Sequence, residues 1–134
     1  MICATHALIG AALGRLLKRP AAAFAAGVGS HVVADMMPHR DFTAAVEVPL
    51  VAAALTAIAL TRGVGSAEFW GAIGATLPDL ENVQCTLPGD DGRRCFPTHR
   101  NGVHGRPREE VISQITVAAA CLCVLACNDR KPAR

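Results

Sequence analysis

The chain has 134 residues, of which 51% are hydrophobic and 18% are charged, and its mean hydropathy is +0.33. This length suits one domain, and the composition is typical of proteins embedded in membranes. A formal net charge of only +2, aromatic residues at 4% and the lack of tyrosine argue against a nucleic-acid binder. We expect a single membrane-associated domain over residues 1–134, surrounded by lipids.

Five apolar segments, separated by proline, glycine or charged residues, predict an all-α fold. The third segment is nearly long enough to cross the hydrocarbon core of a bilayer, whereas the fourth is too short to span it alone. Gly10 and Gly14, like Gly71 and Ala75, lie one helical turn apart, a spacing that lets helix backbones approach closely. We expect a compact antiparallel bundle of about five membrane-embedded helices, at residues 4–18, 21–37, 43–61, 66–77 and 109–127.

A polar stretch at about residues 80–108 separates the fourth and fifth helices. A purely structural connection is seldom this long, so we interpret the stretch as a functional loop. Cys85 and Cys95 lie in it, and the sequence leaves open whether they form a disulfide. The three other closely spaced cysteines are expected to be small buried residues of the last helix: Cys121, Cys123 and Cys127.

Tracing the five helices as an antiparallel bundle brings every histidine to one end. We name the end at which the first helix begins the upper end, and the opposite one the lower end. Histidines scattered over a surface would not sort in this way, so convergence on a site explains them better. The residues expected at the upper end are His6, His31, Asp35, His39, Asp79, His99 and His104.

These seven residues are candidate ligands for a divalent metal ion. His31 and Asp35 are four residues apart and project from one helix face, and His39 follows four positions later. Taken singly, each candidate has an ordinary explanation as a helix-end ion pair, a turn residue, a solvated loop residue or a buried core histidine. Together, imidazoles and carboxylates suit a borderline ion. The sequence therefore predicts a site for one or two ions, with zinc as the first choice and manganese as the alternative.

A resemblance to a known family rests on three motifs: Ser-His-Val-Val-Ala-Asp-Met-Met-Pro-His-Arg-Asp at 30–41, Gly-Ala-Thr-Leu-Pro-Asp at 74–79 and Pro-Thr-His-Arg-Asn-Gly-Val-His at 97–104. They are similar to motifs of the uncharacterised membrane-bound metal-dependent hydrolases related to zinc-dependent phospholipase C. The pair His31 and Asp35 resembles the metal-ligand pair of phospholipase C and of single-strand nuclease relatives. The chain is much shorter than the soluble phospholipases, and Gly105 follows His104 where the membrane branch often has serine. The resemblance implies a hydrolase more firmly than it implies a substrate.

The expected function is metal-dependent, phospholipase C-like hydrolysis of a phosphoester at the membrane surface, with a lipid or lipid-linked headgroup as substrate. A bound ion lowers the pKa of water and holds the oxygens of a phosphoester. Carboxylates that are not ligands can act as a general base, and arginine can hold phosphate. The catalytic candidates are Asp35 and Asp79, with Asp41 and Glu81 in reserve, and Arg100.

The sequence leaves other functions open. One is a non-enzymatic integral membrane protein with a structural metal site or an ion or proton relay. Another is a soluble helical bundle without metal. For a multi-pass protein, basic residues directly at helix ends favour a cytoplasmic location, which places the lower end in the cytoplasm and the site end outside it. These basic residues are Arg15, Lys18, Arg19, Arg62, Arg130, Lys131 and Arg134. The sequence does not predict the oligomeric state.

Overall fold

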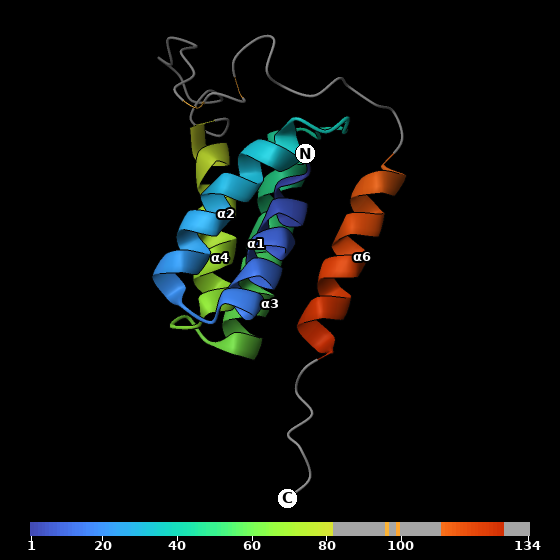
Figure 1. Ribbon diagram of the computed structural model, residues 1–134. Coiled ribbons are helices and arrows are strands. Elements are labelled where there is room, and N and C mark those ends of the chain that lie inside the picture. The colour runs from blue at the N-terminus through green and yellow to red at the C-terminus, as the bar shows by residue number, and fades with distance from the viewer. Residues whose placement is uncertain (82–95, 97–98, 100–110, 128–134) are drawn as a thin grey trace, which may run out of the picture.

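The computed structural model describes residues 1–81, 96, 99 and 111–127. Every regular element in this part of the chain is helical, which confirms the all-α prediction (Figure 1). The helices lie close to the predicted ranges, although the predicted start of the last one falls outside the described residues. The elements are α1 (Cys3–Leu17), α2 (Pro20–Asp35), α3 (Ala44–Arg62), α4 (Ala67–Thr76), the 3-10 turn η1 (Leu77–Asp79) and α6 (Ile112–Ala126).

Local sequence explains where the helices begin and end. Pro20 is the first residue of α2, where its missing N–H costs no hydrogen bond. Ser66 caps α4, because its side chain accepts a hydrogen bond from the Phe69 N–H at 3.0 Å. Lys18 ends α1 in the left-handed conformation, with φ at 59°. These sharp ends let successive helices run antiparallel.

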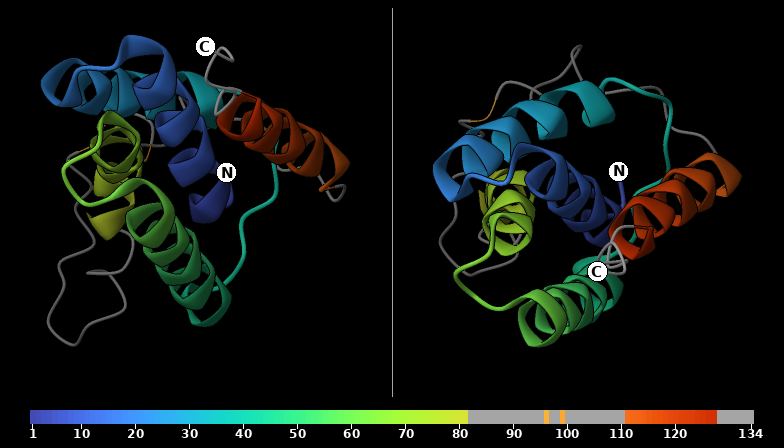
Figure 2. Two further views of the ribbon diagram at one scale, coloured as in Figure 1. Left: turned by 90° about the horizontal axis from the view of Figure 1, so that it is seen from below. Right: turned by 60° about the horizontal axis from the view of Figure 1, so that its bottom comes forward.

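Helices α1, α2 and α4 form the centre of the bundle, and α3 and α6 pack beside it, chiefly against α1 (Figure 2). Glycine makes the central contacts close. A Cβ atom at Gly10 would collide with the carbonyl oxygen of Gly71, and one at Gly14 would collide with that of Ala67. A Cβ atom at Gly27 would also meet the Gly71 carbonyl. The predicted close approach of helix backbones is confirmed.

The interior of the bundle combines small apolar residues, mostly alanine, with several large polar side chains. Its largest fully buried side chains are His6, His31, His39, Gln114 and Asp35. Large apolar side chains instead face outward along several helices, and Ile58 is the only buried residue of the 19 in α3. Small apolar residues and a few large polar ones thus fill the interior, while much of the apolar surface faces outward.

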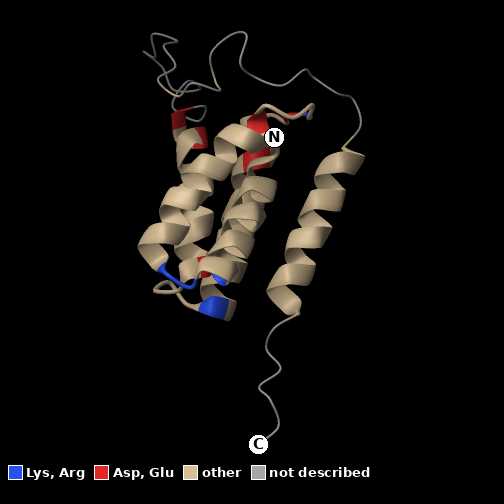
Figure 3. Ribbon diagram, in the orientation of Figure 1, with Lys and Arg blue, Asp and Glu red and all other residues tan. Residues whose placement is uncertain are grey.

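Of the helices that the structure describes, only α3 is long and apolar enough to cross a membrane. Helices α1 and α6 are apolar but have 15 residues each, fewer than the roughly 20 that a spanning helix needs. Charged residues lie toward the two ends of the bundle, mainly acidic at the upper end and basic at the lower end (Figure 3).

The cysteines of α6 differ from expectation. Cys123 and Cys127 are exposed and Cys121 is only half-buried, so the prediction that they are buried is wrong. The reason is that α6 packs mainly against a single helix, α1, and so turns much of its surface outward. Cys85 and Cys95 lie outside the described residues.

Candidate metal centre

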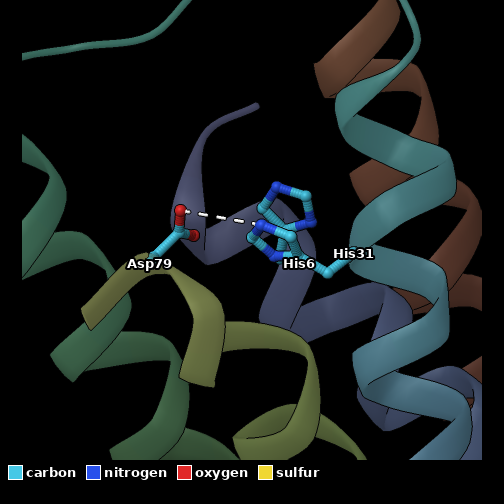
Figure 4. A group of neighbouring side chains, drawn as sticks. All are labelled: His6, His31 and Asp79. Atoms are coloured by element: carbon cyan, nitrogen blue, oxygen red, sulfur yellow. Dashed lines mark ion pairs between the residues drawn. The ribbon is translucent and has the colours of Figure 1, made fainter. Parts of the chain in front are cut away.

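Five of the predicted site residues meet at the upper end of the bundle. They form two overlapping groups, in each of which the potential ligand atoms lie within 4.8 Å of one another. One group consists of His6, His31 and Asp79, and the other of His31, Asp35 and His99. Figure 4 shows the first group, with the Asp79 carboxylate facing the two imidazoles.

The fold explains why these residues converge. His31 and Asp35 share one face of the last turn of α2, where His31 Nε2 lies 3.1 Å from Asp35 Oδ2. The antiparallel start of α1 places His6 beside them, and its ring stacks on that of His31 with the centroids 4.1 Å apart. Asp79 ends η1, the turn that follows α4. Three segments distant in sequence therefore bring their side chains to one place.

The hydrogen bonds of two histidines fix the direction of their ring nitrogens. Nδ1 of His31 donates to the carbonyl oxygen of Ala75 at 2.7 Å, and Nδ1 of His99 donates to Glu81 Oε1 at 2.6 Å. The two Nε2 atoms consequently face each other at 3.3 Å. Metal-binding histidines commonly use one ring nitrogen for such an outer hydrogen bond and the other for the ion.

The carboxylates complete a ring of donor atoms around these two nitrogens. Asp35 Oδ2 lies 3.1 Å from His31 Nε2 and 3.5 Å from His99 Nε2. Asp79 Oδ1 lies 3.9 Å and 3.6 Å from the same two atoms. Tetrahedral ligands bonded to zinc at about 2.0–2.1 Å would be roughly 3.3–3.4 Å apart. The donor atoms of His31, Asp35 and His99 therefore come close to the spacing of zinc ligands, whereas Asp79 Oδ1 lies somewhat farther from both imidazoles.

Charges within the centre stabilise one another. Burial opposes ionisation of Asp35, but hydrogen bonds with the imidazoles, that of His31 first, hold the pKa of its carboxyl below the usual range. Burial likewise opposes ionisation of Asp79, and its hydrogen bond with His99 keeps its pKa low. For His99, burial lowers the pKa, but the carboxylates of Asp35, Asp79 and Glu81 outweigh burial and raise it to about 10. The anionic cluster thus attracts a cation, whether a proton or a metal ion.

One ring nitrogen of His6 is buried without a hydrogen-bond partner among the described residues. Its ring is fully buried, and its Nε2 lies 3.1 Å from Asp35 Oδ1. Its Nδ1 is also buried and has no hydrogen-bond partner among the described residues. Buried polar groups are rarely left unpaired, so this nitrogen is consistent with a bound ion or molecule that would serve as its partner.

Among the predicted residues that the structure describes, His39 is not brought into this group. His39 is buried, but its Nδ1 donates to the carbonyl oxygen of Met37 at 2.6 Å and its Nε2 lies 3.1 Å from Asp41 Oδ1. It belongs to neither group of potential ligands. His104 and Arg100 lie outside the described residues.

Sequence reasoning assigned no role to several residues around the centre. Gln114 in α6 is almost fully buried, and the Met1 amino group lies 3.1 Å from Asp35 Oδ1. Glu81 was expected only as a reserve base, yet it holds His99. A signal for Gln114 was present, because a single amide in an apolar helix is costly to bury without partners.

Comparison of the chain with protein-family models, with curated proteins and with solved structures gives no match. The geometry of the centre is therefore the basis on which a function can be assigned.

Proposed function

We propose that the upper-end cluster binds a divalent metal ion, with zinc as the best match. The observation that carries this proposal is the group of three donor atoms from His31, Asp35 and His99, which lie 3.1–3.5 Å from one another. Two imidazoles and one carboxylate are suitable ligands for zinc, and manganese would be favoured only by a more oxygen-rich set. His6 is the candidate for an additional ligand.

We propose further that this site serves the hydrolysis of phosphoesters. A bound divalent ion supplies Lewis acidity and lowers the pKa of a coordinated water molecule. In this chain, Asp35 would bind the ion together with the two imidazoles, and Asp79, on the more accessible side, is the candidate proton acceptor. The side chains of Asp79 and Glu81 are 16% and 17% exposed, against 2% for Asp35. Arg100, which follows His99 in the sequence, is the candidate contact for phosphoryl oxygens.

We propose that the protein is a multi-pass membrane protein with this site at the bilayer surface. The support is the many large apolar side chains on the exterior of the bundle, the polar side chains buried inside it and the location of charges toward its two ends. Such a site would meet the headgroup of a lipid or of a lipid-linked molecule. Basic residues at the lower end favour the cytoplasm for that end, and hence an extracytoplasmic site.

A second candidate function is a structural or ion-relaying metal site without catalysis. The observation that favours it is burial, since His6, His31 and Asp35 are each at most 1% exposed. A catalytic ion must retain a coordination position for water, whereas a structural ion is closed off by protein ligands. The two functions thus differ in whether water reaches the ion.

One experiment tests both proposals. The protein is purified in detergent, its metal content is measured, and the zinc-loaded form is assayed against phospholipids and a generic phosphodiester. We expect bound zinc and hydrolysis, and we expect Asp35→Asn and His99→Ala to lose both. The matched control is Glu68→Gln, which alters an ion pair with Arg15 at the lower end. Absence of metal from folded wild-type protein would contradict the site. Fully loaded protein without activity would favour the structural function.

A further inference from the structure

Two polar side chains from the outer helices bind the start of α1. Gln114, in α6, accepts a hydrogen bond from the Ile2 N–H at 2.7 Å. Glu47, in the first turns of α3, accepts one from the Cys3 N–H at 2.8 Å. Helix starts leave N–H groups without partners in the helix, and the N-cap residue Ile2 provides no side-chain cap for α1. The outer helices therefore supply the cap that α1 lacks.

The same two side chains also hold the connection between α2 and α3. The Gln114 side-chain amide donates to the carbonyl oxygen of Arg40 at 2.9 Å, and the second oxygen of Glu47 accepts from the Phe42 N–H at 3.1 Å. This connection follows directly after Asp35, the last residue of α2. Each side chain thus links the start of α1 to the connection between α2 and α3, which begins beside the metal centre.

The burial of Gln114 shows that this contact is specific. Its side chain is among the largest fully buried ones of the protein, while Leu125 is the only other buried residue of α6. An amide buried in an apolar helix is unfavourable unless its groups are hydrogen-bonded. Here its oxygen accepts from one segment and its nitrogen donates to another. The pairing selects one docked position of α6.

We propose that Gln114 and Glu47 are positioning residues of the metal centre, which fix the first turn of α1, and thereby His6, against the Asp35 end of α2. The His6 N–H bonds to the Ile2 carbonyl at 3.3 Å, and the His6 imidazole lies 3.1 Å from Asp35 Oδ1. A displaced first turn would carry His6 away from this carboxylate. Docking of α6 and α3 therefore controls the geometry of the site. This inference rests on the proposed metal site.

The test compares variants of the full chain in detergent, with cobalt as the probe ion because its visible spectrum reports ligand geometry. Gln114→Leu removes both hydrogen bonds of the amide. Glu47→Gln preserves shape but turns an NH2 group toward one of the two backbone N–H groups. We expect each variant to lower cobalt affinity about 10–100-fold, as for other residues that orient ligands, and to alter the spectrum. Thr116→Val is the matched control, because this exposed hydroxyl donates to the Ile112 carbonyl within α6 and, among the described residues, to no other group.

A second measurement separates this inference from the metal site itself. Hydrogen exchange of the first turn of α1 is followed in the metal-free proteins, and we expect faster exchange in Gln114→Leu and Glu47→Gln than in the wild type. Folded variants with wild-type cobalt affinity, spectrum and exchange would overturn the inference. If the wild type binds no cobalt, the proposed site fails, and exchange alone then decides whether these side chains hold α1.

Discussion

The outer hydrogen bonds of two imidazoles determine what the centre can hold. Because the Ala75 carbonyl and Glu81 take the Nδ1 protons of His31 and His99, both Nε2 atoms face inward. Two facing lone pairs repel, so without metal a proton between them is favourable, and neighbouring carboxylates hold it on His99. A metal ion entering the site must replace that proton.

Glu81 should be important for binding although it is not a ligand. Glu81→Gln weakens the charge-assisted hydrogen bond to His99, which lies at 2.6 Å, and so releases the ring orientation. We expect zinc affinity to fall about 10–100-fold, measured by competition with a chelator. Glu68→Gln, at the opposite end of the bundle, should leave the affinity unchanged. An unaltered affinity in Glu81→Gln would show that the ring is held by other contacts.

The raised pKa of His99 gives the metal-free protein and the zinc complex opposite responses to pH. A raised pKa contributes stability that is complete below the ordinary value of 6.5 and is lost as the pH rises through about 10. Zinc binding displaces the same proton, so its affinity should increase about tenfold per pH unit in this interval. We expect zinc to raise the thermal midpoint more at pH 8.5 than at pH 7. An equal or smaller increase at the higher pH would contradict this assignment.

At the scale of elements, glycine contacts determine how closely the central helices pack. Gly71 of α4 meets Gly10 of α1 on one side and Gly27 of α2 on the other. Both neighbouring contacts are with backbone atoms, which cannot rotate away as a flexible side chain can. These contacts set the spacing of three helices: α1, which carries His6, α2, which carries His31, and α4, which leads into the turn η1 that ends at Asp79.

Gly71→Ala should therefore be strongly destabilising, because the added methyl group forces α1 and α4 apart. We expect a loss of about 1–3 kcal/mol or more in the free energy of unfolding, the usual effect of overpacking. Gly29→Ala is the matched control, because nothing lies within 4 Å of a Cβ atom there, and it should be neutral or stabilising by up to about 1 kcal/mol. Denaturant unfolding in detergent measures both variants. Equal stability of the two would contradict the close packing.

The elements and most of the centre were predictable because local chemistry determines them. Proline and capping residues mark helix ends, and antiparallel helices of similar length bring His6, His31 and Asp79 to one end. His39 was not predictable, because α2 ends at Asp35 and four-residue spacing carries no meaning beyond the helix. The partners of Gln114 could be identified only from the three-dimensional fold, because they lie far away in sequence.

At the scale of the whole molecule, many large apolar side chains are exposed, while several large polar ones are buried beside small apolar residues. The proposed lipid environment would explain both features, because the exposed apolar side chains would then face acyl chains while the buried polar groups pair with one another. Helix α3 is the critical element for this proposal. It is the one described helix that is long and apolar enough to span a bilayer, and only one of its residues, Ile58, is buried. Its ends lie at opposite ends of the bundle, so its crossing would separate the site from the basic lower end (Figure 3).

Cysteine labelling from one side of the membrane tests this arrangement. Thr43→Cys lies at the upper end of α3 and Val64→Cys just beyond its lower end, and both positions are exposed. In a background without native cysteines, an impermeant maleimide applied to intact cells should label Thr43→Cys, because the proposed orientation, favoured by the basic residues, places the lower end in the cytoplasm. Val64→Cys should react only after permeabilisation. Labelling of Val64→Cys alone would reverse the orientation, and equal labelling of both positions would show that α3 does not cross the membrane.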